Sequence, residues 1–294
     1  MSVVSGKKNI FCEGKQSSLD SRLLNKVVEN LRGDRPTIVA AGSKFTFSIF
    51  VQGYFSRDEV VNQRYIVFRD RDFDAKPTAS IQLLQLDNRL SHSSVFLTYR
   101  ACVENYLFNA DLIHSYWVAK YAEKLENPSS RWGHGDSPGI QVISAWIETA
   151  ARSLQEYQAV RWALADLLQM SAARVQLRTT WTGGSGQLPS SLALEDCRVQ
   201  AIELINQFTQ AVATVTQDRF EESLATYQHR FVQEEFWVQQ QYLIWFHGKD
   251  LQKAMQRQQS QYISLKAFFD WAIPQLDITQ HSDLMELRTR IEQL

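Results

Sequence analysis

The sequence predicts an α/β domain with a mostly parallel sheet, Rossmann-like in having helices on both faces, followed by an all-α C-terminal domain. Two observations predict it. Short apolar runs alternate with helix-like stretches in the order strand, helix, strand, helix, strand, which indicates βαβ units. All eight tryptophans lie from Trp117 onward, and strand patterns become scarce after about Arg100. We therefore expect an α/β domain over residues 1–115, a linker over 116–138 and a helical domain over 139–294.

The first strand is the apolar run at residues 9–12, which ends at Glu13 and Gly14. Glycine permits the sharp turn that the chain needs before the next helix. Ser17 or Ser18 is the expected N-cap of that helix. Its apolar positions follow helical spacing: Leu19, Leu23, Leu24, Val27 and Leu31.

Two more buried strands follow, at residues 36–42 and 65–68. In open sheets of this kind, ligands gather beyond the carboxyl ends of the strands. Glu13, Lys44 and Asp70 all fall at or just beyond such ends. We therefore expect the carboxylates after the first and third strands to converge.

An acidic run, Asp70-Arg71-Asp72-Phe73-Asp74, follows the third strand directly. In an extended backbone its three aspartates share one side. Two carboxylates about 4 Å apart repel by roughly 4 kcal/mol near a protein surface, and a divalent cation with oxygen ligands offsets that repulsion. The alternative is a solvated acidic turn that the flanking arginines neutralise.

Other motif interpretations fit less well. A calcium-binding EF-hand loop opening at Asp70 would need glycine and glutamate where Ala75 and Ile81 stand. A phosphatase with an aspartate nucleophile normally carries its motif on the first strand, whereas this run follows the third. The segment 42–45 lacks the spacing of a phosphate-binding P-loop, so we expect any ATPase involved to be a separate chain.

The charge composition limits how this chain could bind nucleic acid. The chain of 294 residues has a formal net charge of −1 and no long basic run, although duplex nucleic-acid binders usually carry a basic face. Positive charge near the acidic cluster must therefore be local, or a partner must supply the grip on the substrate. The local candidates are Lys15, Lys44, Arg69, Arg71 and Arg100.

Cysteine use and hydropathy favour a cytoplasmic protein. Cys12, Cys102 and Cys197 are scattered and form no C-x-x-C pair, so we expect three reduced, buried thiols. No apolar run approaches the roughly 18 residues that a membrane span needs, and the N-terminus lacks the apolar core of a signal peptide.

The second half of the chain shows helical periodicity, and Gly248 is expected to end a helix as a C-cap. Aromatic residues at this spacing are more typical of a core than of a base-stacking surface. The expected helices cover about 140–176, 196–247 (one helix or two joined), 253–271 and 282–294.

Several motifs together resemble the Toprim fold family, the acidic metal-binding domain of topoisomerases, primases and OLD nucleases. They are similar in particular to a bacterial Toprim-like family, often encoded beside an ABC-type ATPase, that includes the effector subunit of the PARIS phage-defence system. The residues that carry the resemblance are Glu13-Gly14, Gly42-Ser43-Lys44, the run 69–74, the segment 97–107 and Phe246-His247-Gly248-Lys249-Asp250-Leu251.

The resemblance implies a cytoplasmic nuclease effector of an antiphage system. An ABC/SMC-like ATPase partner would keep it silent, and on release it would act as a homodimer. The implied substrate is nucleic acid, with transfer RNA favoured. The alternatives are an OLD-like DNA nickase or repair nuclease, and a regulatory subunit that binds metal without cutting.

The expected chemistry is phosphodiester hydrolysis with one or two Mg²⁺ or Mn²⁺ ions. Asp70, Asp72 and Asp74 are the expected metal ligands. Glu13 either completes the metal shell or acts as the general base, and the sequence does not separate these roles.

Four further residues are candidates for the same site. Lys44 is expected to stabilise charge on the phosphate oxygens. Glu104 is an auxiliary acid or, alternatively, an i, i+4 partner of Arg100. His247 and Lys249 are catalytic candidates whose more ordinary interpretation is structural.

Overall fold

The computed structural model describes residues 8–31, 34–43, 46–47, 65–86, 94–127, 129–170, 188–209, 215–260 and 262–294. The chain forms two compact units. The first comprises Met1–Arg71, Pro77–Val103 and Phe269–Leu294, and the second comprises Asp72–Lys76 and Glu104–Phe268. The α/β core and the helical regions that the sequence predicts are both present.

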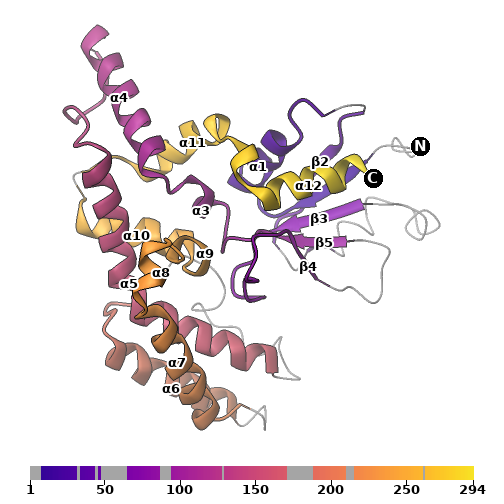
Figure 1. The fold of residues 1–294 in the computed structure, drawn as a ribbon, viewed down its shortest axis with the longest axis vertical. Helices are drawn as coiled ribbons and strands as arrows, with labels where there is room; N and C mark the ends of the chain where they lie inside the picture. Colours follow the sequence, from indigo (N-terminus) through magenta and orange to yellow (C-terminus); the bar gives the residue numbers. More distant parts are fainter. Residues whose placement is uncertain are drawn as a thin grey trace. The chain divides into compact units, whose positions relative to one another are not determined.

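The first unit is built on a mixed five-stranded sheet in the order β2-β1-β3-β5-β4 (Figure 1). The first four strands in this order are parallel, as expected, and β4 lies antiparallel to β5 at one edge. The strands are β1 (Asn9–Cys12), β2 (Thr37–Ala40), β3 (Tyr65–Arg69), β4 (Leu84–Leu86) and β5 (Ser94–Leu97).

The register of the central strands aligns their carboxyl ends. Cys12 of β1 lies opposite Phe68 of β3, and Phe68 in turn lies opposite Phe96 of β5. Every residue of β1 and β3 is buried, because parallel strands are covered on both faces. Residues that directly follow β1 and β3 therefore emerge at the same edge of the sheet.

Helix α1 (Leu19–Val27) begins where the sequence predicts, with Ser18 as its N-cap. The Ser18 Oγ accepts a hydrogen bond from the Ser21 backbone N–H at 3.4 Å. The apolar face of α1 is buried through Leu23, Leu24 and Val27. The helix packs against α12 (Ser282–Glu292), which lies beside it in Figure 1.

The C-terminal segment completes the first unit rather than the helical one. Asp283 Oδ2 accepts a hydrogen bond from the Tyr99 backbone N–H at 3.3 Å, and Glu286 Oε2 accepts one from the Leu83 N–H at 3.0 Å. Two short elements lead into α12. They are α11 (Leu265–Gln275), which enters the first unit at Phe269, and the 3₁₀ helix η1 (Ile278–Gln280).

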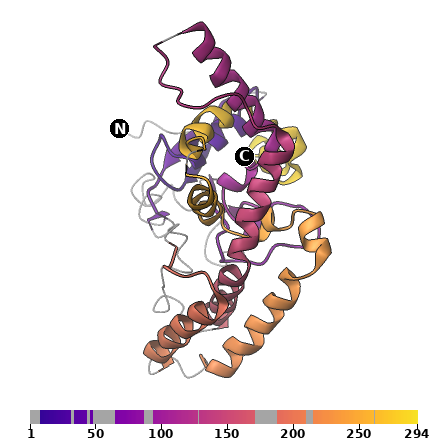
Figure 2. The same cartoon turned by 90° about the vertical axis from the view of Figure 1, so that its left-hand side faces the viewer.

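The second unit is organised around α5 (Ile140–Met170), a helix of 31 residues (Figure 2). It contacts α4, α6, α7 and α10, and it confirms the helix expected from residue 140. The other helices of this unit are α3 (Glu104–Leu107), α4 (Ala110–Glu126), α6 (Leu194–Thr209), α7 (Gln217–Phe231), α8 (Glu234–Val238), α9 (Tyr242–Trp245) and α10 (Gly248–Gln258).

The expectation of one helix, or of two joined helices, over 196–247 is wrong, because four helices, α6, α7, α8 and α9, lie in the described part of this stretch. Thr216 has an extended backbone and caps α7 through a hydrogen bond that its side chain accepts from the Arg219 N–H. Gln233 is likewise extended and precedes α8. These extended residues turn the chain between helices without glycine or proline.

Gly248 does not end a helix; it begins α10. Phe246 and His247 both have extended backbones, and the His247 side chain caps the new helix. Glycine favours helix ends of both kinds, although it is more strongly enriched after the last turn. The C-cap prediction is therefore wrong at this position.

Most described tryptophans of the second unit are buried, as the sequence predicts: Trp117, Trp146, Trp162, Trp237 and Trp245. Trp162 is fully buried and donates its indole N–H to the Trp245 carbonyl at 3.0 Å. Trp146 is buried and donates to the Met255 carbonyl at 3.0 Å. Within the described part of the chain, no helix is both long enough and apolar enough for a membrane crossing.

Candidate metal centre

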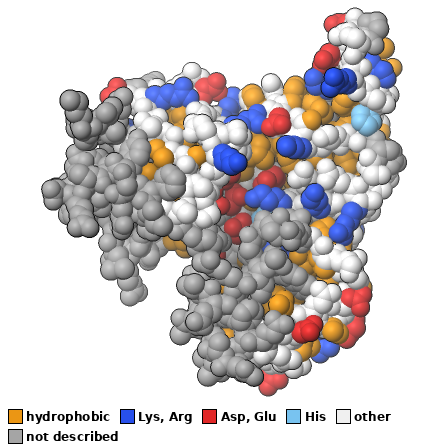
Figure 3. Space-filling view, turned by 180° about the vertical axis from the view of Figure 1, so that it is seen from behind, with side chains coloured by type: hydrophobic (Ala, Val, Ile, Leu, Met, Phe, Trp, Pro, Cys, Tyr) orange, Lys and Arg blue, Asp and Glu red, His pale blue; other side chains and the backbone are white. Residues whose placement is uncertain are grey.

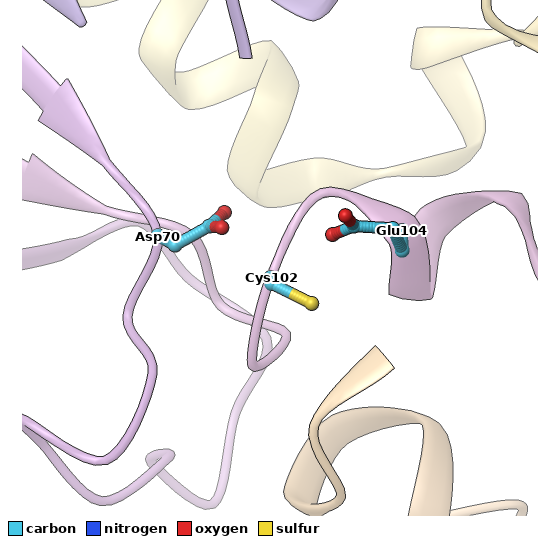
Figure 4. A group of neighbouring side chains, drawn as sticks. All are labelled: Asp70, Cys102 and Glu104. Atoms are coloured by element: carbon cyan, nitrogen blue, oxygen red, sulfur yellow. The ribbon is translucent and has the colours of Figure 1, made fainter. Parts of the chain in front are cut away.

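Three buried side chains bring metal-ligating atoms together: Asp70, Cys102 and Glu104. One ligand atom from each lies within 4.8 Å of the other two. Figure 4 shows the carboxylates of Asp70 and Glu104 turned toward each other, with the Cys102 sulfur nearby. The exposed fractions of the three residues are 3%, 0% and 7%, so these groups are largely removed from water.

Asp70 owes its position to the sheet. It directly follows Arg69, the last residue of β3, and therefore lies at the carboxyl edge. Its Oδ1 accepts a hydrogen bond from the Val103 backbone N–H at 2.9 Å. Val103 stands between Cys102 and Glu104 in the chain, so this bond brings the loop that carries both residues to Asp70.

The same loop is fixed at its start. Thr98 Oγ1 accepts a hydrogen bond from the Arg71 backbone N–H at 3.0 Å and donates one to the Arg100 carbonyl at 2.7 Å. The Arg71 Nε donates to the Tyr99 carbonyl at 3.1 Å. These bonds tie the segment after β5 to the segment after β3, which makes the loop a rigid support for Cys102.

The donor set fits a divalent cation. Ligand atoms that share one ion, at bond lengths of about 2.0–2.6 Å, lie no more than about 5 Å apart. Carboxylate oxygens are the usual ligands of Mg²⁺ and Mn²⁺, whereas a thiolate favours softer ions such as Zn²⁺. The cluster thus combines two hard ligands with one soft ligand.

Asp72 does not continue an extended strand. β3 ends at Arg69, and Asp72 has a φ of +50° within a turn. Aspartate is one of the few residue types that tolerate this left-handed conformation. The expectation that Asp70, Asp72 and Asp74 share one face of an extended backbone is therefore wrong.

Within the second unit, Asp72 meets His247. Asp72 Oδ1 lies 3.0 Å from His247 Nε2, and both side chains are buried. The Lys249 backbone N–H donates to His247 Nδ1 at 3.3 Å. Because a backbone N–H can only donate, Nδ1 is the acceptor, and Nε2 carries the proton that is donated to Asp72.

Asp74 lies half-buried in the same turn. Gln169 Nε2 donates to the backbone carbonyls of Phe73 and Asp74, at 3.1 and 3.3 Å. These bonds fix the end of the turn on α5. Asp72 and Asp74, both expected as ligands, are not members of the cluster formed by Asp70, Cys102 and Glu104.

Glu13 directly follows β1, at the same edge of the sheet as Asp70. Its carbonyl accepts a hydrogen bond from Ser18 Oγ at 3.2 Å. The next residue, Gly14, has a φ of +79° and exchanges backbone hydrogen bonds with Gly42. Glu13 is likewise not a member of the donor cluster, and Lys44 lies outside the described residues.

Glu104 opens α3 and belongs to the donor cluster, while its role as an auxiliary acid stays a prediction. Its Oε1 lies 4.0 Å from the Lys249 Nζ. This contact connects Glu104 to the start of α10.

A buried ion pair lies beneath the start of α10, and sequence analysis missed it. Arg161 and Asp250 form this pair, with side chains 1% and 0% exposed. Gln158 Nε2 donates to Asp250 Oδ2 at 2.8 Å, and Gln158 Oε1 accepts a bond from the His247 N–H at 3.3 Å. The only sign of this pair in the sequence was the charged residue Arg161 within the apolar pattern of α5.

All three cysteines are buried free thiols, as expected. Burial raises the pKa of Cys12 to about 12 and that of Cys197 to about 11, and neighbouring carboxylates add to both shifts. These two thiols are therefore protonated and unreactive at neutral pH. The sequence did not indicate that Cys102 lies among metal-ligating groups.

On the face drawn in Figure 3, the Lys and Arg side chains of the described residues lie in small groups. On the face in Figure 3, Lys and Arg side chains stand among acidic and apolar ones, and the coloured atoms form no continuous basic surface. This distribution agrees with the net charge of −1.

A scan against models of protein families finds no match to the sequence, and a comparison with curated proteins finds no significant relative.

Proposed function

We propose that this chain is a divalent-metal-dependent phosphodiester hydrolase that cuts nucleic acid. The observation that carries the proposal is the buried cluster of Asp70, Cys102 and Glu104 beyond the carboxyl end of β3. Buried carboxylates this close repel each other, and a cation offsets that repulsion. Open α/β sheets place their ligands at this edge.

In the proposed reaction, Asp70 and Glu104 hold the cation. When bound, a divalent ion supplies Lewis-acid polarisation of the phosphate and lowers the pKa of a coordinated water. Glu13, at the same edge but not a member of the donor cluster, accepts the proton of the attacking water. Asp72 positions the turn after β3 through its hydrogen bond with His247.

The finer identity is proposed mainly on sequence motifs. The sheet order and the acidic residues after β1 and β3 are compatible with a Toprim-like domain. On that basis we propose an antiphage effector that cleaves transfer RNA after release from an ABC/SMC-like ATPase. A partner that grips the nucleic acid also suits a chain whose described side chains form no continuous basic patch on the face drawn in Figure 3.

The test is incubation of the purified chain with total transfer RNA and, separately, with plasmid DNA. Each reaction contains Mg²⁺, Mn²⁺ or EDTA. We expect cleavage only with metal, and preferentially of transfer RNA. Asp70→Asn should abolish cutting, whereas Asp111→Asn, which alters an exposed aspartate of α4, should leave it unchanged.

Three outcomes would contradict the proposal in different ways. Cutting in EDTA, or by the Asp70→Asn variant, would remove the metal cluster from the mechanism. Nicking of plasmid DNA with intact transfer RNA would indicate a DNA nuclease. Metal binding without hydrolysis of either nucleic acid would indicate a regulatory subunit.

A further inference from the structure

Lys249 is the partly exposed member of an otherwise buried polar segment. In residues 247–250, the side chains of His247 and Asp250 are 0% exposed, whereas the Lys249 side chain is 40% exposed. The chain thus buries two ionisable groups at the start of α10 and directs a single cation outward from it.

The backbone of Lys249 is held in place by its neighbours. Its N–H donates to His247 Nδ1, and His247 Nε2 donates to Asp72. The next residue, Asp250, is locked by Arg161 and Gln158. These bonds join residues of the second unit and fix the backbone from which the Lys249 side chain extends.

The side chain of Lys249 reaches Glu104, whose carboxylate belongs to the donor cluster. The Lys249 Nζ lies 4.0 Å from Glu104 Oε1, and the Glu104 side chain is 10% exposed. A half-exposed pair at this separation adds little to folding stability. The contact does place an ammonium group beside a carboxylate that is proposed to hold a cation.

We propose that Lys249 binds a phosphate oxygen of the nucleic-acid substrate beside the candidate metal centre. This inference rests on the proposed function. An ammonium group is a compact point charge that binds phosphate well. A metal ion held by Glu104 would offset the charge of this carboxylate, so that the Lys249 ammonium group would be available to the phosphate. Lys249 thereby supplies positive charge at the site itself, in a chain whose net charge is −1 and whose sequence has no long basic run.

The test separates metal binding from phosphate binding. Binding of Mn²⁺ is measured from the loss of the free-ion signal in electron paramagnetic resonance. Binding of inorganic phosphate is measured from the broadening of its ³¹P resonance by protein-bound Mn²⁺. The variants are Lys249→Ala, Lys249→Arg and the control Lys253→Ala, which removes an exposed lysine one turn further along α10.

We expect Lys249→Ala to keep Mn²⁺ affinity and to lose about tenfold or more in phosphate affinity. Lys249→Arg should restore most of that loss, and Lys253→Ala should match the native chain. Circular dichroism and urea midpoints should be unchanged in all three, because both lysines are partly or fully exposed.

Equal phosphate affinity in Lys249→Ala and the native chain would overturn the inference, as would a native chain that binds Mn²⁺ but no phosphate. Failure of the proposed function is distinguishable. In that case the native chain would bind Mn²⁺ and phosphate in a Lys249-dependent manner and yet cut neither transfer RNA nor plasmid DNA.

Discussion

Cys102 contributes a sulfur atom to a group whose other donors are carboxylate oxygens. A thiol binds metal only as the thiolate, and thiolates select Zn²⁺ over Mg²⁺ far more strongly than carboxylates do. The choice of metal at this centre therefore depends on a single atom. Zn²⁺ is expected to compete with Mg²⁺ or Mn²⁺ at this candidate site.

Replacing Cys102 with serine should lower Zn²⁺ affinity by at least about tenfold while leaving Mg²⁺- or Mn²⁺-dependent cutting in place. Isothermal titration with Zn²⁺ and with Mn²⁺ measures both affinities. Cys197→Ser is the control, because Cys197 is buried away from the donor cluster and hydrogen-bonds to the Ser191 carbonyl. Unchanged Zn²⁺ affinity in Cys102→Ser would exclude the sulfur as a ligand.

Gly14 allows the sharp turn that directly follows Glu13. Its φ is +79°, and a Cβ there would lie 2.6 Å from the Ser18 side chain, which caps α1. Gly14→Ala should cost about 1–3 kcal/mol of unfolding free energy and reduce cutting by displacing Glu13. Urea denaturation measures the first effect.

The matched control for Gly14 is Gly133→Ala, where a Cβ meets nothing within 4 Å. It should change the unfolding free energy little. If both variants lose the same stability, the turn at Gly14 is not the cause.

At the level of elements, periodicity predicted α5 well and the helix breaks poorly. The apolar spacing from Ile143 onward identified α5 because its face packs against several helices. The breaks between α6 and α10 depend on extended backbones at residues such as Thr216 and His247. Such caps use side chains that are common elsewhere, so they leave a weak local signal.

The junction of α5 with α10 rests on the buried pair of Arg161 and Asp250. Asp250→Asn removes the carboxylate charge that faces the buried guanidinium, and it should cost about 3–5 kcal/mol of unfolding free energy. Glu148→Gln is the matched control, since Glu148 pairs with Arg152 on the exposed side of α5 and its loss should cost under about 1 kcal/mol.

Urea denaturation of the two variants measures both losses of unfolding free energy. A loss in Asp250→Asn no larger than that in Glu148→Gln would mean that the buried pair does not hold the two helices together. A loss several times larger is the expected result.

At the scale of the whole molecule, the sequence predicted the parallel sheet and the edge at which acidic residues emerge. Apolar runs bounded by Glu13 and Asp70 carry that information locally. The contact of His247 with Asp72 could not be predicted, because 175 positions separate the two residues in the chain. The packing of residues 269–294 with the sheet could not be predicted either, because these residues lie far from the strands in the sequence.

Stability should fall as the pH drops from about 6.5 to about 4. Burial, and then the positive charge of Arg100, lower the pKa of His281 to about 4, although Asp277 opposes the shift. Between these pH values the unfolded chain binds a proton at this position that the folded chain does not bind. The unfolded state is therefore favoured progressively across this window, whereas neither state is protonated at this histidine at higher pH.

Urea midpoints at pH 7 and pH 5 measure the effect. In His281→Asn, the decrease between the two pH values should be smaller than in the native chain, because the titrating group is gone. An equal decrease in both proteins would assign the pH dependence to other groups.

The sheet unit is discontinuous in the chain, and this has a consequence for its synthesis. Strands β1 to β5 leave the ribosome long before α12, yet Asp283 and Glu286 of α12 bind the backbone beside β4 and β5. A nascent chain in which α12 has not yet been made lacks these two hydrogen bonds. The sheet unit therefore stays incomplete on the ribosome until α12 has been translated and has emerged.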